Sequence, residues 1–114
     1  MTTETNKTSG VTVVKLLESR LGAAEAARFK SAIAALIAEG YTELLLDLST
    51  LQFMDSSGLG AMVSVFKMLT DRGNVTVAGI SENLSSLFRM TGMDRVFPVY
   101  RSADEALESI LCEC

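Results

Sequence analysis

A short apolar run from Leu44 to Leu46 constrains the fold of this 114-residue chain more than any other feature. The run contains no polar residue, which is typical of a strand that is covered on both faces in a parallel sheet. Asp47 comes directly after the leucines and is expected near the carboxyl end of that strand. The helices that such a strand needs on either face make an α/β fold the first expectation.

Helical periodicity agrees with this expectation on both sides of the run. Apolar residues recur at helical spacing in four segments, and glycine follows three of them as a stop signal. The predicted helices span Ala23 to Glu39, Ser57 to Arg72, a segment from Ser81 or Asn83 to Gly92, and a last helix capped by Ser102.

Strand patterns alternate with these helices. The predicted strands are Val11 to Leu17, the leucine run, Val75 to Gly79, and Val96 to Tyr100, where Pro98 indicates an edge strand. This order predicts βαβ crossovers in a mixed, mostly parallel sheet of four or five strands with about four α-helices. Residues 1–10 form a polar arm that can add a weak edge strand, and residues 11–114 form one domain.

Composition excludes several classes of function. With 10 Lys plus Arg and a net charge of −4, the chain has no basic surface for nucleic acid. The first ten residues are too polar for a signal peptide, and no apolar run approaches the ~20 residues needed to span a bilayer. We therefore expect a cytoplasmic protein that binds other proteins and has no direct membrane insertion.

Metal and cofactor chemistry also lack their usual residues. The chain has no histidine, and Cys112 and Cys114 could supply at most two ligands of a tetrahedral zinc site. We interpret the two cysteines as free thiols, with a redox pair or half of an intermolecular metal site as the alternative. No phosphate-binding or dinucleotide-binding glycine loop is present, so no cofactor is expected.

The segment Phe53 to Gly60 places two hydroxyls where a buried strand leads into a helix. The first turn of a helix has unpartnered N–H groups and the positive end of the macrodipole, so it accommodates a phosphate. The alternative is that Asp55 is an ordinary N-cap and that Ser57 and Gly58 merely fit the first turn.

The helix that begins at these serines is apolar on two sides, which leaves Ser64, Lys67 and Asp71 to face water. Either both sides pack internally, or the residues nearest the serines form a docking surface for a partner protein. In the second case glycines allow close approach and a methionine adapts to the partner. The predicted docking residues are Asp55, Ser57, Gly58, Leu59, Gly60 and Met62.

Three stretches together resemble the STAS family of anti-sigma-factor antagonists: Leu44 to Leu48, Phe53 to Gly60, and Leu87 to Gly92. The resemblance implies a bacterial regulator that binds an anti-sigma factor, often itself a serine kinase, and releases it when a serine is phosphorylated. In that family the modified serine directly follows the aspartate, which is Ser56 here. A serine phosphatase acting on phospho-Ser56 is the further implied partner.

The chain departs from the family pattern before its first helix. Relatives commonly read Gly-x-Leu-Asp there, whereas this chain has Ser19 in place of the glycine and Gly22 in place of the aspartate. In the family fold this loop lies beside the phosphorylation region, so the change bears on partner identity. Thr91 and Gly92 match a later element of the family, which can also be a simple helix C-cap.

Three classes of function follow. The first is a phosphorylation-controlled binding module, and the second is a STAS accessory subunit of a membrane transporter that docks without modification. The third is an enzyme using Asp47, Asp55 and Ser56, which the absence of a base, a metal cage and a cofactor loop disfavours. We therefore expect a regulator without enzymatic activity.

Overall fold

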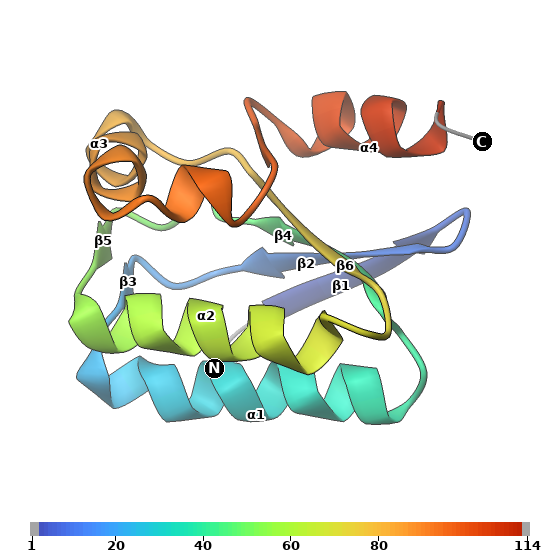
Figure 1. Cartoon of the computed structure of the whole chain (residues 1–114), viewed down its shortest axis with the longest axis horizontal. Coiled ribbons are helices and arrows are strands. Elements are labelled where there is room, and N and C mark those ends of the chain that lie inside the picture. The colour runs from blue at the N-terminus through green and yellow to red at the C-terminus, as the bar shows by residue number, and fades with distance from the viewer. Residues whose placement is uncertain (1–2, 113–114) are drawn as a thin grey trace.

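The computed structural model describes residues 3–112 and has a central five-stranded sheet with helices on both faces (Figure 1). The strand order is β1-β2-β4-β6-β7, in which β1 is antiparallel to β2 and the other neighbours are parallel. These strands are β1 (Thr3–Thr8), β2 (Val11–Leu16), β4 (Glu43–Asp47), β6 (Asn74–Ala78) and β7 (Val99–Tyr100). The α/β class and the mixed, mostly parallel sheet are confirmed.

In the described part of the chain, four α-helices and one short 3-10 helix connect and follow the strands. They are α1 (Ala23–Ala38), α2 (Ser56–Leu69), α3 (Glu82–Thr91), the 3-10 helix η1 (Met93–Arg95) and α4 (Ala103–Leu111). The predicted caps agree with these bounds, because Ser81 caps α3, Ser102 caps α4 and Gly92 ends α3 in the left-handed conformation. Within residues 3–112, no helix is long and apolar enough to cross a membrane.

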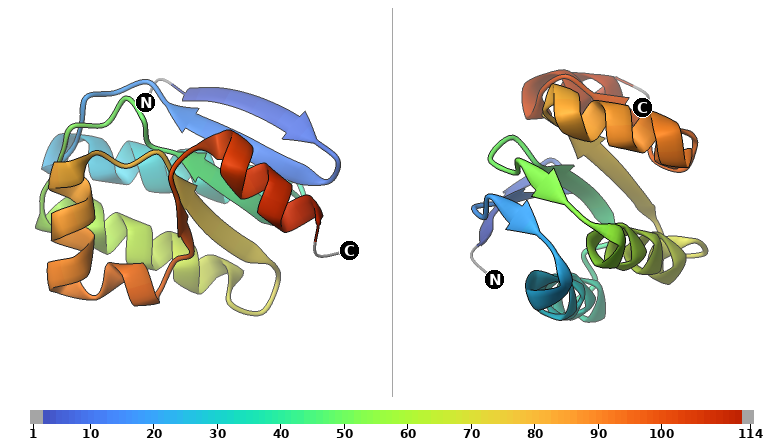
Figure 2. Two further views of the ribbon diagram at one scale, coloured as in Figure 1. Left: turned by 90° about the horizontal axis from the view of Figure 1, so that it is seen from above. Right: turned by 90° about the vertical axis from the view of Figure 1, so that its left-hand side faces the viewer.

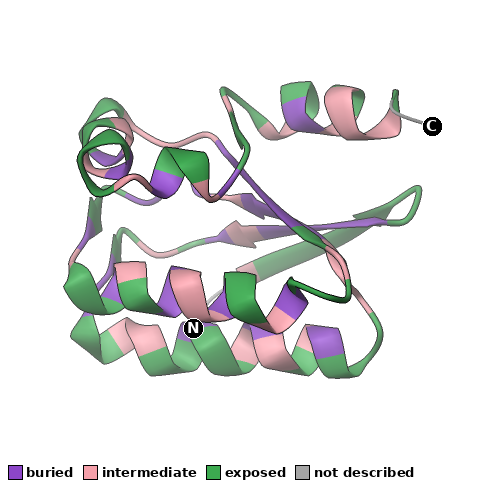
Figure 3. Cartoon of the chain, in the orientation of Figure 1, coloured by how far each residue is buried: buried purple, intermediate pink, exposed green. Residues whose placement is uncertain are grey.

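The two faces of the sheet have cores of unequal size. Helices α1 and α2 lie side by side on one face and α4 lies on the other, as two perpendicular views show (Figures 1 and 2). Leu44 and Leu46 belong to the larger cluster with Phe29 of α1 and Val65 of α2, whereas Leu45 belongs to a smaller cluster beneath α4. The leucine run is therefore covered from both sides, and Figure 3 shows β4 and β6 as mostly buried.

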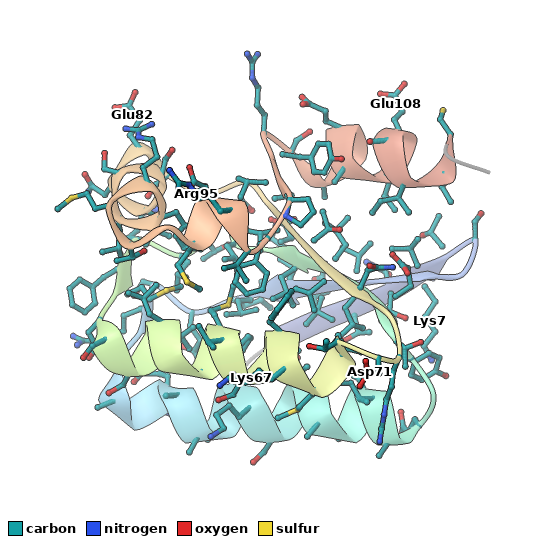
Figure 4. All side chains as sticks on the ribbon, viewed as in Figure 1. Lys7, Lys67, Asp71, Glu82, Arg95 and Glu108 are labelled. Carbon is teal, nitrogen blue, oxygen red and sulfur yellow. The ribbon has the colours of Figure 1, made fainter. Side chains whose placement is uncertain are left out.

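The predicted polar arm forms an ordered edge strand. β1 pairs along its whole length with β2, and the hairpin turns through Ser9 and Gly10, which both have positive φ angles. The ammonium group of Lys7, labelled in Figure 4, donates a 2.6 Å hydrogen bond to the Tyr41 hydroxyl and lies 4.0 Å from the centre of that ring. This contact fastens β1 to the segment between α1 and β4.

The last strand is shorter than predicted. Only Val99 and Tyr100 pair with β6, because the Val96 amide instead donates to the Met93 carbonyl and ends η1. Pro98 has no N–H to extend the pairing, although its carbonyl accepts from Val77 at 2.9 Å. The expected edge position of this strand is confirmed.

A second, two-stranded sheet was not predicted. β3 (Arg20–Leu21) pairs in parallel with β5 (Phe53–Met54), and the amides of Gln52 and Phe53 both donate to the Ser19 carbonyl. In Figure 1 this small sheet lies at the end of the molecule where α1 and α2 begin, with α3 above it. It fixes the loop before α1 against the loop before α2.

Candidate functional site

Ser56 and Ser57 are exposed at the first turn of α2. Asp55 is the N-cap of that helix, and its Oδ1 atom accepts a hydrogen bond from the Gly58 amide at 3.0 Å. The cap predicted from the sequence is therefore confirmed. It leaves both serine hydroxyls at the surface, at the positive end of the helix.

The same carboxylate also reaches the first turn of α1. Asp55 Oδ2 accepts a hydrogen bond from the Ala23 amide at 3.2 Å, so one side chain contacts the N-termini of two helices. Gly22, the N-cap residue of α1, has no side chain with which to cap. Its own amide donates to Glu25 Oε1 at 2.9 Å.

This geometry accounts for the departure at Gly22 physically. A methyl group built on Gly22 would lie 3.1 Å from Asp55 Oδ2 and 3.3 Å from a terminal guanidinium nitrogen of Arg20. The Asp55 carboxylate thus occupies the space beside the N-terminus of α1 that a side chain at residue 22 would enter. With glycine at residue 22, Asp55 is the side chain that accepts from the first turn of α1.

A cation and an aromatic ring border the same site. The register of the small sheet places Arg20 opposite Phe53, and the guanidinium carbon lies 5.0 Å from the centre of the ring. Arg20 Nε also lies 3.7 Å from Glu25 Oε1. Phe53 is 48% exposed, which is unusual for a phenylalanine of a small domain.

Sequence reasoning did not single out Arg20, Phe53 or Glu25 as site residues. Their proximity depends on β3 and β5, which are two residues long and have no periodicity to detect. The available signal was that Arg20 lies in the very loop that departs from the family pattern.

The predicted docking residues divide into exposed and buried ones. Gly60 is exposed, with no atom within 4 Å of a methyl group built on it, and Leu59 is half-buried. Met62 is fully buried in the larger core cluster, so its prediction as an adaptable surface contact is corrected. Gly58 is also buried, because its Cα faces the Leu21 carbonyl and Met54 with no space for a side chain.

Both apolar sides of α2 pack internally over most of their length. Ala61, Val65 and Leu69 are buried, and the ring of Phe66 contacts that of Phe97 edge-on at 5.6 Å between centres. Beside the serines, a docking surface is therefore confined to the residues from Asp55 to Gly60 that remain accessible. Lys67 and Asp71 are exposed as predicted, whereas Ser64 is partly buried and its hydroxyl donates to the Gly60 carbonyl at 3.0 Å.

The remaining candidates have local structural roles. Asp47 Oδ1 accepts from the Ser49 amide at 3.0 Å, in a cavity of about 340 Å³ that none of the predicted docking residues lines. The Thr91 hydroxyl donates to the Leu87 carbonyl at 2.8 Å next to the C-cap of α3. Among the described residues, no three His, Cys, Asp or Glu side chains gather to hold a metal. Cys112 is an exposed free thiol, and Cys114 lies outside the described residues.

Comparison with known proteins identifies the family. The sequence profile of the STAS domain matches residues 2–106, which is most of the chain. The chain belongs to the STAS domain family. We can therefore compare it with other STAS domains in its mixed sheet, in the capped first turn of α2 and in the exposed serine pair.

The named relatives are anti-sigma factor antagonists. This STAS domain is 32% identical over 68 residues to the anti-sigma F factor antagonist of Paenibacillus polymyxa, covering 59% of this chain and 58% of the relative. It is 30% identical over 73 residues to the anti-sigma-B factor antagonist of Bacillus subtilis, covering 63% and 67%. The matches span roughly 58 to 65% of the length of this antagonist of Paenibacillus polymyxa and of the matching relatives from two Thermotoga species.

A solved structure supports the same relationship. The crystal structure of an anti-sigma factor antagonist from Mycobacterium paratuberculosis superposes on this STAS domain with a TM-score of 0.83 and 27% sequence identity. The match covers 95% of this chain and 92% of the other.

Proposed function

We propose that this chain is an anti-sigma factor antagonist controlled by phosphorylation of Ser56. The unmodified protein binds an anti-sigma factor that is also a serine kinase, and the phosphorylated protein releases it. A serine phosphatase acting on phospho-Ser56 returns it to the binding form. The observation that carries the proposal is an exposed serine at the first turn of α2, directly after a carboxylate that already caps the helix.

The charge change is suited to switching an interface while leaving the fold intact. A phosphoserine carries about −1.5 to −2 charges at neutral pH, and a helix N-terminus stabilises an anion by only ~0.3–2 kcal/mol. Asp55 opposes part of that gain, so the stability of the domain changes little. At a protein interface an unfavourable charge contact costs several kcal/mol, which lowers affinity by about a hundredfold or more.

The open first turn of α2 gives the partner a place to bind. Gly60 is exposed and unobstructed, Leu59 is partly accessible, and the exposed ring of Phe53 precedes the serines. These groups lie within a few residues of Ser56, so a phosphate there would enter the interface. The proposed docking surface consists of Asp55, Ser56, Ser57, Leu59 and Gly60.

The proposal is tested by identifying the partner and mapping the modification. A pull-down from the source organism with mass spectrometry identifies the kinase, which is then purified and incubated with ATP and the wild type, Ser56→Ala or Ser57→Ala. We expect one phosphate on the wild type and on Ser57→Ala, and none on Ser56→Ala. Modification of Ser57, or of neither serine, contradicts the assignment.

A binding measurement completes the test. Ser56→Asp should weaken binding to the purified kinase in calorimetric titration while the melting temperature stays within a few degrees. Capture of a membrane transporter with no phosphorylation would instead favour the accessory-subunit function.

A further inference from the structure

The charged groups near Ser56 include the guanidinium of Arg20, which makes only weak contacts. Arg20 has a side chain that is 62% exposed, whereas that of Glu25 is only 14% exposed. The separation of 3.7 Å between Arg20 Nε and Glu25 Oε1 is beyond hydrogen-bond length, and Glu25 Oε1 already accepts from the Gly22 amide at 2.9 Å. The second contact of Arg20 is with the exposed ring of Phe53. Contacts of this kind are weak at exposed positions.

A phosphate on Ser56 would need such a cation. Asp55 directly precedes Ser56, and its carboxylate already accepts the Gly58 amide of the first turn. A dianion on the next residue would therefore face a like charge, with one of the helix N–H groups already occupied. Like charges in such proximity disfavour the ionised forms unless a counter-charge is supplied.

The guanidinium of Arg20 lies where it can supply that charge. Arg20 and the Asp55 carboxylate border the same small space beside Gly22, at 3.3 and 3.1 Å from the position of a Gly22 methyl group. A guanidinium pairs with phosphate through two parallel N–H donors, which makes it a stronger phosphate partner than a point charge.

We propose that Arg20 pairs with the phosphate when Ser56 is phosphorylated, leaving Glu25 and the ring of Phe53. This inference rests on the proposed function, because it concerns the regulation of the same serine. The movement partly neutralises the phosphate within the proposed docking surface and uncovers the Phe53 ring beside that surface.

Gly22 keeps Arg20 available for this role. A carboxylate at residue 22 would extend into the space shared by Asp55 and Arg20, where it would pair with the guanidinium before any phosphate arrived. Glycine at residue 22 and arginine two residues earlier thus act together in this chain.

The test uses protein with phosphoserine incorporated at residue 56 during translation, so that no kinase is needed. The second pKa of the phosphate is measured by ³¹P NMR titration in the wild type, Arg20→Gln and Arg28→Gln. Arg28 is the matched control, because its guanidinium lies 4.0 Å from the other Glu25 oxygen and its removal changes the net charge equally. A nearby cation favours the dianion, so we expect the phosphate pKa of Arg20→Gln to lie about half a unit or more above that of the wild type. Arg28→Gln should match the wild type.

A further variant at residue 22 tests whether Arg20 pairs with the phosphate. Gly22→Asp should raise the phosphate pKa in the same direction as Arg20→Gln, and thermal melts of the unphosphorylated variants verify that they are folded. Equal pKa values in the wild type and Arg20→Gln, or an equal increase in Arg28→Gln, overturn the role of Arg20. If Arg20→Gln raises the phosphate pKa but the phosphorylated wild type still binds its anti-sigma factor, the proposed function fails and the pairing of Arg20 stands.

Discussion

Gly58 and Gly60 lie two residues apart on α2 and face opposite environments. A methyl group on Gly58 would overlap the Leu21 carbonyl oxygen and lie 2.8 Å from Met54 Cγ, whereas one on Gly60 would meet nothing within 4 Å. The first glycine is required for the approach of α2 to β3. The second only lowers helix propensity, so it is free to serve a partner.

Substitutions at the two glycines should therefore have opposite effects on stability. Gly58→Ala should destabilise the protein by about 1–3 kcal/mol through overlap with the backbone of β3. Gly60→Glu should stabilise it by a few tenths to ~1 kcal/mol, because glycine is a poor helix former at an open position. Thermal and urea unfolding of the two variants measure these changes.

Binding of Gly60→Glu provides the second half of this prediction. The glutamate adds bulk and negative charge beside Ser56, so binding to the anti-sigma kinase should be lost while stability increases. Titration calorimetry of this variant with the purified kinase measures the loss of binding. Wild-type affinity would place Gly60 outside the interface, and unfolding of this variant would show that Gly60 is packed internally.

Removing the Asp55 carboxylate should destabilise the protein more than removing an ordinary helix N-cap does. Asp55→Ala deprives both the Gly58 and the Ala23 amides of their acceptor, and losing one cap typically costs ~0.5–2 kcal/mol. We expect a loss near the upper end of that range or beyond it. Asp55→Asn, which keeps one acceptor oxygen, should recover about half.

Asp47→Ala is the matched control for this measurement, because Asp47 accepts from a single loop amide, that of Ser49. Urea unfolding compares the three variants. A cost for Asp55→Ala no larger than that for Asp47→Ala would show that the contact with α1 contributes nothing.

At the scale of elements, β1 depends on a contact outside the sheet. Its residues are mostly exposed, and Lys7 joins it to Tyr41 through a hydrogen bond and a contact with the ring. Tyr41→Phe removes the hydrogen bond and keeps the ring, whereas Tyr41→Ala removes both.

Hydrogen exchange of the β1 amides should therefore increase slightly in Tyr41→Phe and more in Tyr41→Ala, with little change in α1. The pair at this exposed position contributes about 1 kcal/mol or less, so global stability should fall only modestly. Equal exchange in both variants would mean that the ring contact does not hold the strand.

Which elements could be predicted depended on their length and their caps. The helices had sustained apolar periodicity together with Ser81, Ser102 and Gly92 at their ends, and these signals are local in sequence. β3, β5 and η1 contain two or three residues each, too few for a period, and form because distant segments meet. The extent of β7 was overestimated because the amides of residues 96 and 97 both donate to the Met93 carbonyl and are not available to pair with β6.

The same distinction applies to the candidate site. Asp55 and the serines were identified because a cap and its helix are adjacent in sequence. The contact of Asp55 with Ala23, and the proximity of Arg20 to Phe53, depend on how two loops pair, which no local pattern encodes. Met62 was misplaced because a methionine on a doubly apolar helix fits the core as well as a surface.

At the scale of the whole molecule, the two layers of helices are unequal. Helices α1 and α2 contribute several fully buried side chains to the larger cluster. Among the described residues of α4, only Ala106 is buried. The outward side of α4 carries Glu108, which points away from the sheet in Figure 4. Less apolar area holds α4, so it should open at a lower free energy than the rest.

A charge placed under each layer tests this difference. Ala106→Asp should release α4 while the remaining sheet stays folded, whereas Ile33→Asp in α1 should unfold the protein. Hydrogen exchange by residue separates the two results. Global unfolding of Ala106→Asp would show that α4 belongs to the same cooperative unit as α1 and α2.

The shared cap at Asp55 also has an evolutionary consequence. A lineage with glycine at residue 22 relies on a single carboxylate for the N-termini of both α1 and α2, so selection against its loss acts through two helices at once. A lineage with a capping side chain at residue 22 relies on residue 55 for one helix alone. Across homologous sequences the two positions should therefore covary, with replacements of the acid at 55 concentrated where residue 22 can cap α1 by itself.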